Sequence, residues 1–294
     1  MLAYLQLIRP LNAVMAGFAT FIGSLIVAKG NALSIHIGLA MLVAFLVTGA
    51  GNAINDYFDV EADRINRPNR PIPSGRIKKS HAVFFSTLLF AIGIILASFI
   101  NEMTFVIALV NSVILYLYSW DLKDRLLVGN IAVSYLVGST FLFGGAAFGN
   151  IKLPLILMLL AGLANLAREI VKTLEDVEGD RLRILKKLVG KAKEAVMRRM
   201  KEESVTRFTY NEKAMVSLAA LFLLLGILIS PIPYLLGILG WPYFIFLIPT
   251  DLTFAFCIFL LALKPKKKTY HAVSKFIKLG MLFGLLSFVV GALV

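Results

Sequence analysis

The chain has 294 residues, of which 59% are hydrophobic and only 16% are charged, and its mean hydropathy is +0.84. Soluble domains are closer to half apolar and a quarter charged, so this composition excludes a soluble enzyme and a disordered chain. The single cysteine, Cys257, lies within an apolar segment, which excludes a disulfide scaffold and indicates a buried thiol. The formal net charge of +13 is typical of nucleic-acid binding, but the positions of the charges indicate orientation in a membrane instead.

Apolar segments long enough to cross a bilayer follow one another along the whole chain. A helix needs roughly 20 apolar residues to span about 30 Å of hydrocarbon. Nine segments approach this length, near residues 11–28, 35–55, 82–100, 103–119, 127–148, 152–171, 214–236, 242–263 and 272–294. The sequence therefore predicts an all-α, polytopic membrane protein with nine transmembrane helices.

Basic residues are sorted between the two sides of these spans. The second, fourth, sixth and eighth connections, with the adjoining helix ends and Arg9, hold 28 of the 30 Lys and Arg residues, and only Lys29 and Lys152 lie opposite. By the positive-inside rule this side is cytoplasmic, with the N-terminus inside and the C-terminus outside. Of the 17 acidic residues, 15 lie on the same side, the exceptions being Glu102 and Asp251. The charge thus indicates attraction to anionic headgroups or phosphorylated substrates, and we expect any chemistry at the cytoplasmic mouth.

The first acidic cluster lies at the end of the second span, in residues 52–76. Its polar positions follow at steps of four, three and four, and they are Asn52, Asp56, Asp59 and Asp63. A helix with 3.6 residues per turn places such positions on one face. Stacked carboxylates repel one another unless a cation neutralises them, and oxygen ligands of this kind suit Mg²⁺ better than zinc. The arginines that follow are Arg64, Arg67 and Arg70. The segment predicts a site for Mg²⁺ and diphosphate, and the alternative is a solvated loop of mixed charges.

The second cluster lies at the end of the sixth span, in residues 165–181. Four positions at steps of four share one helical face, namely Arg168, Lys172, Asp176 and Asp180. Two cations followed by two carboxylates would bind phosphate oxygens and metal in that order. The alternative is a ladder of ion pairs on an exposed helix, each contributing only a few tenths of a kcal/mol. The position of this cluster on the same side of the membrane as the first one favours the functional interpretation.

The fourth connection adds Lys123, beside Tyr118 at the expected membrane interface, although topology alone would also place a lysine there. Two acidic faces that hold Mg²⁺ on a diphosphate, with Arg and Lys neutralising its remaining charge, lower the barrier to loss of diphosphate. If the reacting carbon is allylic, departure leaves a resonance-stabilised cation that a nucleophile can trap. An isoprenoid tail would explain a site at a membrane surface. We therefore expect the nine helices to surround a lipid-accessible cavity with a polar cap on the cytoplasmic side.

The sequences NDYFDVEAD (Asn55 to Asp63) and DVEGD (Asp176 to Asp180) resemble the two aspartate-rich motifs of the UbiA-type intramembrane prenyltransferases. The resemblance covers nearly the whole chain and implies a single membrane-embedded prenyltransferase domain over residues 1–294. The chain departs from the family in a basic, amphipathic insertion at about 181–207, where the family usually has a short loop. An interfacial helix and a solvated basic helix are both compatible with this insertion.

The resemblance also implies roles for individual residues. The carboxylates expected to be catalytic and to bind Mg²⁺ are Asp56, Asp59, Asp63, Asp176 and Asp180, and Asn52 is expected to join them as a ligand of metal and substrate. The residues expected to contact diphosphate are Arg67, Lys123 and Lys172. The remaining candidates for substrate binding, which the charge pattern supplies, are Arg70, Tyr118 and Arg168.

Three further segments, NRPIPSGR, GSTFLFGGAA at 138–147 and REIVKTLEDVEGD at 168–180, are most similar to the archaeal branch of this family. That similarity implies transfer of a geranylgeranyl group from its diphosphate to the free glycerol hydroxyl of geranylgeranylglyceryl phosphate. The product is digeranylgeranylglyceryl phosphate, for archaeal membrane lipids. The implied partners are an isoprenyl diphosphate donor, a glyceryl-lipid phosphate acceptor and membrane lipids, with no nucleic acid, and the sequence leaves the oligomeric state open.

Two other functions stay open from the sequence. Within the family, the acceptor could be aromatic, such as a quinone or haem precursor. A polytopic transporter is the alternative outside the enzymes, but its key ionisable groups should lie near the bilayer midplane. Only Asp251, two residues after Pro249, does so. An intramembrane carboxylate is a functional candidate by default, but a kink shielded by neighbouring helices is equally compatible with this position.

Overall fold

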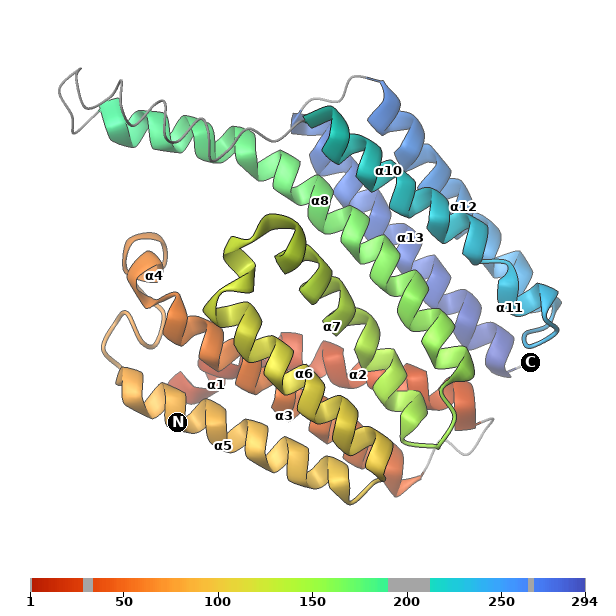
Figure 1. The fold of residues 1–294 in the computed structure, drawn as a ribbon, viewed down its shortest axis with the longest axis horizontal. Coiled ribbons are helices and arrows are strands. Elements are labelled where there is room, and N and C mark those ends of the chain that lie inside the picture. Colours follow the sequence, from red (N-terminus) through yellow and green to blue (C-terminus); the bar gives the residue numbers. More distant parts are fainter. Residues whose placement is uncertain (1, 29–33, 190–211, 264–266, 294) are drawn as a thin grey trace. The chain divides into compact units, whose positions relative to one another are not determined.

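The structure is a computed structural model that describes the backbone of residues 2–28, 34–189, 212–263 and 267–293. It also describes their side chains, other than those of residues 65, 66, 126, 176–189 and 267. All regular structure in these ranges is helical (Figure 1). The helices are α1 (Leu2–Ile8), α2 (Pro10–Ala28), α3 (Ile35–Phe58), α4 (Val60–Asn66), α5 (Lys79–Ser98), α6 (Glu102–Trp120), the 3₁₀ turn η1 (Leu122–Asp124), α7 (Leu126–Ala146), α8 (Lys152–Val189), α10 (Glu212–Ile229), α11 (Ile232–Leu235), α12 (Trp241–Ala262) and α13 (Lys267–Leu293).

Nine stretches of the described chain are long and apolar enough to cross a membrane, which confirms the predicted number of spans. They start and end within a few residues of the predicted positions, as in Pro10–Ala28 and Trp241–Ala262. Local sequence explains several of the ends. Ser34 caps the N-terminus of α3, and Asn101 and Thr104 form a reciprocal capping box at the start of α6. The prolines at 68, 71 and 73 prevent α4 from continuing towards α5.

The chain divides into two compact units. Unit 1 comprises residues 1–162, 231–246 and 285–294, and within it α3 packs against α2, α5 and α6, while α2 also packs along α7 (Figure 1). The short C-terminal pieces of unit 1 meet through the rings of Tyr243 and Phe288, whose centroids are 5.1 Å apart. Large apolar side chains such as Phe84 on α5 and Leu11 on α2 remain exposed, as expected for helices that face lipid.

The α2–α7 crossing is unusually close because glycines and small hydroxyl residues form it. Gly144 lies where a Cβ atom would be 2.0 Å from the Thr20 carbonyl oxygen, and a Cβ at Gly23 would be 2.1 Å from the Phe141 carbonyl oxygen. Thr20 donates a hydrogen bond of 3.2 Å to the Thr140 carbonyl, and Ser24 donates one of 3.0 Å to the Gly144 carbonyl. Small residues of this kind let transmembrane helices approach closely, so α2 and α7 form a fixed wall of unit 1.

Unit 2 comprises residues 163–230 and 247–284 and contains the later part of α8, α10 and most of α12 and α13. Tyr270 of α13 donates a 2.6 Å hydrogen bond to Glu212 of α10, and Phe254 of α12 packs against Gly280 of α13. The carboxylate of Asp251 accepts hydrogen bonds of 3.1 and 3.0 Å from the hydroxyl of Ser230. The intramembrane carboxylate thus has a polar partner within its own unit, as a shielded kink requires.

Candidate active site

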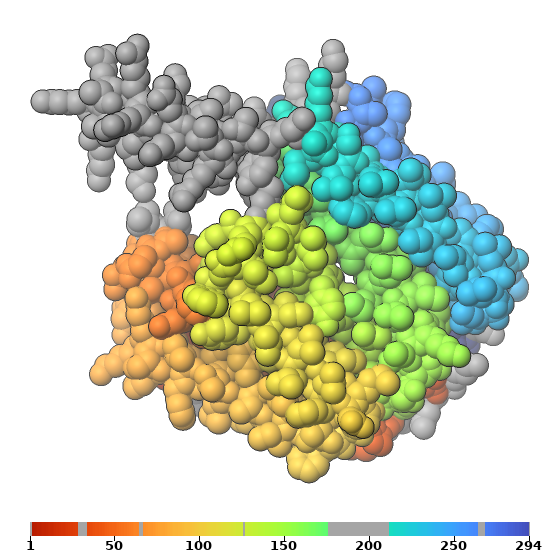
Figure 2. Space-filling view, viewed as in Figure 1, coloured from red at the N-terminus to blue at the C-terminus, as the bar shows by residue number. Residues whose placement is uncertain are grey.

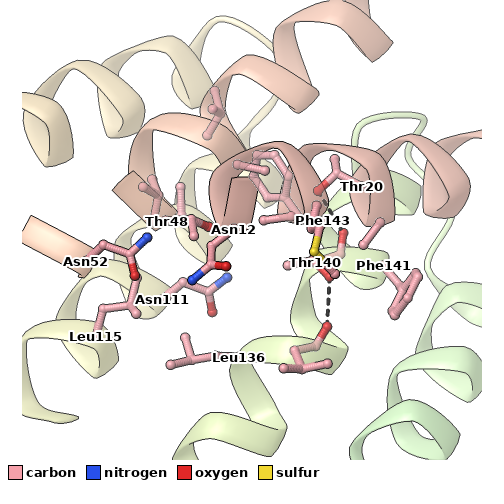
Figure 3. A pocket seen from close by; sticks show the side chains of 18 of the residues that line it. Asn12, Thr20, Thr48, Asn52, Asn111, Leu115, Leu136, Thr140, Phe141 and Phe143 are labelled. Atoms are coloured by element: carbon pink, nitrogen blue, oxygen red, sulfur yellow. Dashed lines mark hydrogen bonds between the residues drawn. The ribbon is translucent and has the colours of Figure 1, made fainter. Parts of the chain in front are cut away.

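Unit 1 contains an apolar chamber of about 480 Å³ between α2, α3, α6 and α7 (Figure 3). Aliphatic and aromatic side chains form most of its wall, including Val47, Leu136 and Phe143. Thr20 and Thr140 lie at one side of the view in Figure 3, joined by the hydrogen bond that crosses from α2 to α7. A mostly apolar cavity with few polar groups is typical of a site for an apolar ligand, and its place among candidate membrane spans suits a hydrocarbon chain.

Three asparagines bring polar groups to the other side of this chamber. Asn12, Asn52 and Asn111 come from α2, α3 and α6, and their amides lie near one another in Figure 3. Asn52 donates a 2.9 Å hydrogen bond to the Ile8 carbonyl, which fixes its amide beside the joint between α1 and α2. The Oδ1 atom of Asn111 is buried and has no hydrogen-bond partner in the structure. Because a buried polar atom without a partner is costly, this oxygen is a candidate acceptor for a ligand.

One helical turn beyond Asn52, Asp56 is the centre of a buried charge network. Its side chain is only 3% exposed, and it binds the guanidinium groups of both Arg9 and Arg70. Arg70 also binds Asp63, with 2.5 Å between Nη1 and Oδ2, and the Asp63 side chain is 9% exposed. Buried charges persist only when they are paired, so the two carboxylates and two guanidiniums depend on one another. Asp56 and Asp63 therefore lie on a common side, as the helical spacing predicts.

Asp59 has different surroundings from its neighbours in the motif. α3 ends at Phe58, Asp59 has φ −83° and ψ 1°, and α4 begins at Val60, so the predicted single helix is interrupted here. The Asp59 carboxylate accepts a 2.8 Å hydrogen bond from Asn55 and lies 2.5 Å from Nζ of Lys123. The orange surface of the α3–α4 region borders the yellow-green surface that follows α6 in Figure 2. The structure therefore brings Lys123 to the first motif across 64 residues of sequence.

Glu61, the remaining carboxylate of this segment, belongs to the exposed side of α4. It pairs with Arg64 at 2.9 Å and with Lys79 at 3.1 Å. The hydrogen bond from Lys79, together with the charge of Arg64, holds the pKa of Glu61 below its ordinary value. Arg64, which the sequence offers as a phosphate ligand, is thus engaged at the surface, on the opposite side of α4 from the buried network.

Arg168 and Lys172 of the second cluster lie in unit 2, on α8. Both bind Glu169, with distances of 2.7 Å from Arg168 Nη1 and 3.1 Å from Lys172 Nζ. The Nε atom of Arg168 is buried and has no hydrogen-bond partner in the structure. α8 continues through positions 176 and 180, but the side chains of Asp176 and Asp180 lie outside the described residues, as do those of the 181–207 insertion. Their proposed roles stay predictions.

The oxygen-rich donor set suits Mg²⁺ in its chemistry, because carboxylate and amide oxygens are the ligands this hard cation prefers. Within the described part of the chain, however, no three acidic, histidine or cysteine side chains converge on one point where a metal ion could sit. Each carboxylate of the first motif is paired with a basic group instead. The residue types of the first motif fit Mg²⁺. For the carboxylates to bind it, the Arg and Lys groups now paired with them would have to pair with other anions, such as phosphate oxygens.

Two residues of the site, Arg9 and Asn111, are not among the site residues that the sequence predicts. The sequence analysis uses Arg9 only as evidence for membrane orientation, whereas in the structure it binds Asp56, which lies 47 residues away. Its position before Pro10, at the break between two helices, was the one available signal. Asn111 lies inside an apolar span, and a polar amide at such a position is the signal that could have identified it. Tyr118 and Asn52 both line the chamber, and the predicted role of Tyr118 in substrate binding stays a prediction.

A family model and several known proteins match this chain over nearly its whole length. The model of the UbiA prenyltransferase family matches residues 16–291. The chain belongs to the UbiA prenyltransferase family. It is therefore an enzyme, a prenyltransferase, as the paired motifs predict.

Similarity to individual proteins is just as extensive. The digeranylgeranylglyceryl phosphate synthase of Methanopyrus kandleri is 44% identical over 296 residues, covering 100% of both chains. A solved structure concerned with digeranylgeranylglyceryl phosphate synthase in membranes is 39% identical, with a TM-score of 0.86 over 99% of this chain and 98% of its own. A UbiA homologue from Archaeoglobus fulgidus, solved with GPP and Mg²⁺ bound, is 17% identical, with a TM-score of 0.59 over 97% of this chain and 99% of its own. At that identity the likeness shows the shared fold.

Proposed function

We propose that this prenyltransferase transfers a geranylgeranyl group from its diphosphate to the free glycerol hydroxyl of geranylgeranylglyceryl phosphate, giving digeranylgeranylglyceryl phosphate. The observation that carries the proposal is the buried network of Asp56, Asp63, Arg9 and Arg70 one helical turn from an apolar chamber. Such a site brings a charged headgroup and a hydrocarbon tail together. The full-length similarity to the Methanopyrus kandleri enzyme selects a glyceryl lipid over an aromatic acceptor.

The chamber holds the donor's hydrocarbon chain, and the cations that pair with the first motif, one helical turn beyond Asn52, bind the diphosphate. Lys123 lies 2.5 Å from Asp59 and therefore belongs to the first motif. The basic groups that neutralise the carboxylates then turn to phosphate oxygens, with which Arg and Lys form charge-assisted hydrogen bonds.

The proposed ligands of Mg²⁺ are the oxygens of Asn52, Asp56, Asp59 and Asp63, with Asp176 and Asp180 from the second motif. When bound, Mg²⁺ would neutralise charge that develops on the departing diphosphate. Release of Arg70 from Asp56 and Asp63 frees both the carboxylate oxygens and the guanidinium for the substrate complex. The ion pairs with Arg9 and Arg70 compensate the charge of the buried carboxylates.

In the reaction, the bond between C1 of the geranylgeranyl group and the diphosphate oxygen breaks, and its electron pair leaves with diphosphate. The glycerol oxygen then shares an electron pair with C1 and loses its proton. No histidine lines the chamber among the described residues, so we assign the proton to the diphosphate or to a carboxylate of the first motif.

The site lies on the cytoplasmic side of a multi-pass cell-membrane protein, with the N-terminus inside. The support is the distribution of basic residues, of which 28 of 30 fall on the side of the two motifs. Residues 1–294 form one functional domain in this proposal, although the chain folds as two compact units.

The decisive experiment offers the purified full chain geranylgeranyl diphosphate with either geranylgeranylglyceryl phosphate or an aromatic quinone precursor. Mass spectrometry of the product should show the glyceryl diether, formed with Mg²⁺ and lost in excess chelator. Asp56→Asn should abolish turnover, and Arg125→Gln serves as the control because Arg125 is exposed and its ion pair among the described residues is with exposed Asp121. Efficient prenylation of the aromatic compound with no glyceryl product would contradict the acceptor assignment.

A further inference from the structure

The chamber of unit 1 has a polar side that a hydrocarbon chain does not explain. Its members are Asn12, Thr48, Asn52 and Asn111, which lie on the same side of the view in Figure 3. On α3, Thr48 and Asn52 are followed by Asp56 at steps of four, so these three positions share one helical face. The polar side of the chamber therefore leads along α3 to the buried charge network.

Asn111 reaches the chamber from the face of α6 that forms part of its wall. Four positions on this face follow at steps of three, four and three, and they are Ala108, Asn111, Leu115 and Tyr118. A Cβ atom at Gly51 would be 2.8 Å from Cδ2 of Leu115, so α6 passes close to α3 beside Asn52. Packing thus places Asn111 one helical turn from this contact, next to the polar part of α3.

The amide oxygen of Asn111 lacks a partner in the part of the chain that the structure describes. The residue is only 9% exposed, and its Oδ1 atom is buried without a hydrogen bond. Asn52 differs, because its amide donates to the Ile8 carbonyl. An apolar side chain of the same shape as Asn111 would avoid the cost of burying this oxygen. A buried polar atom that stays unpaired requires an explanation, and an absent ligand supplies one.

An amide oxygen needs a hydrogen-bond donor, and the substrates of the proposed reaction offer few. The geranylgeranyl chains are hydrocarbon, and the ether and diphosphate oxygens accept hydrogen bonds. The free glycerol hydroxyl of the acceptor is an uncharged donor that a mostly apolar chamber can take up. Because this hydroxyl must reach C1 of the donor, it has to lie where the chamber meets the first motif. The polar side of the chamber is that place.

We propose that Oδ1 of Asn111 accepts the hydrogen bond of the acceptor's reacting glycerol hydroxyl and so selects an acceptor that carries one. The assignment rests on the proposed function for the identity of the acceptor. The hydrogen bond directs a lone pair of the hydroxyl oxygen towards C1, while the bond from C1 to the diphosphate oxygen breaks and its electron pair leaves with diphosphate. The amide is too weak a base to keep the proton, which passes to the diphosphate or to a carboxylate of the first motif as the new carbon–oxygen bond forms.

The first test is a cycle that pairs one ligand hydroxyl with one side chain. Binding is measured on the purified full chain with Mg²⁺ and geranylgeranyl thiolodiphosphate, a donor analogue whose bridging sulfur slows ionisation. The two ligands are geranylgeranylglyceryl phosphate and a geranylgeranyloxypropyl phosphate, which lacks only the free hydroxyl. In the unaltered chain the hydroxyl should tighten binding by about ten- to a hundredfold. In Asn111→Leu this advantage should disappear, while the affinity for the donor analogue stays the same.

Thermal unfolding separates this role from a structural one. Asn111→Leu fills nearly the same space and removes the unpaired oxygen, so the variant should melt at the same temperature or higher. A lower melting temperature with equal loss of affinity for both lipids would overturn the proposal, since Asn111 would then only support packing. Asn111→Ala repeats the cycle if leucine is not accommodated. Ser112→Ala is the matched control, because Ser112 is buried on the same helix and donates within it to the Ala108 carbonyl at 2.7 Å.

Hydrolysis of the donor without acceptor tests a rival role for the same oxygen, stabilisation of the allylic cation. Release of diphosphate from geranylgeranyl diphosphate should be unchanged in Asn111→Leu, whereas kcat/KM for the glyceryl acceptor should fall by about ten- to a hundredfold. Equal losses in hydrolysis and in transfer would overturn the proposal and assign Oδ1 to the cation.

Failure of the proposed function would have a different signature. A chain in which Asn111→Leu removes the hydroxyl's advantage in binding, but which forms no diether, keeps Asn111 as a ligand of the hydroxyl and contradicts the reaction. A chain that forms the diether with unchanged kcat and KM in Asn111→Leu keeps the reaction and contradicts the role of Asn111.

Discussion

The substitution Gly144→Ala tests whether the close α2–α7 crossing sets the shape of the chamber. The new Cβ would be 2.0 Å from the Thr20 carbonyl oxygen and 2.7 Å from the Ser24 backbone nitrogen. Ordinary contact begins near 3.4 Å, so the two backbones must separate by about 1.4 Å. Overpacking of this kind costs about 1–3 kcal/mol. The hydrogen bonds donated by Thr20 and Ser24 would also be stretched, at about 0.5–1.5 kcal/mol each.

We therefore expect Gly144→Ala to destabilise the chain by about 2–6 kcal/mol, the combined range of these terms. Turnover should fall with it, because α2 and α7 both line the chamber. The assay is thermal unfolding in detergent, followed by product formation at saturating donor. Gly162→Ala is the matched control, since its Cβ would meet its nearest neighbour, the Ser134 carbonyl oxygen, at an ordinary 3.6 Å. Unchanged melting temperature and unchanged turnover in Gly144→Ala would refute the reasoning.

Three further substitutions address the charged groups. Lys123→Gln should leave Asp59 without its cation. The KM for the donor should rise by about tenfold or more, because one charge-assisted hydrogen bond to diphosphate is lost. An unaltered donor KM would exclude Lys123 as a ligand of the diphosphate. Asp180→Ala should abolish turnover while Glu178→Ala, off the same helical stripe, is tolerated, and equal losses would contradict the predicted face. Ser230→Ala should lower stability by about 1–3 kcal/mol by removing the hydroxyl from the half-buried Asp251 carboxylate, and thermal unfolding that matches the unaltered chain would show that this contact contributes nothing.

Local sequence was sufficient for the secondary structure of this protein. In a bilayer every backbone group must be hydrogen-bonded within its own segment, so a run of apolar residues has few structures other than a helix. The nine spans and their order follow from that constraint, and prolines, Ser34 and Asn101 mark several ends. The family also followed from sequence, since two aspartate-rich motifs and nine spans together are highly specific.

The spacing of the acidic residues was also sufficient to predict part of the geometry of the first motif. Steps of four and three residues do bring Asp56 and Asp63 to one guanidinium, that of Arg70. Asp59 accepts from Asn55 one helical turn earlier, as helical spacing also predicts, but its cation is Lys123 and not Arg70. Periodicity gives the face of a residue on its own helix, and it cannot anticipate which distant cation packs against that face.

The sequence by itself determined the fold class, the membrane spans, the family and the residue types at the candidate site, because each depends on contacts within one helix or on composition. Only the tertiary structure decided which charges meet. Arg9 reaches Asp56 across 47 residues and Lys123 reaches Asp59 across 64, and both pairings depend on how α1, α3 and α6 pack. Packing also created the chamber, since a cavity is a property of the space between helices and has no signature in any one of them.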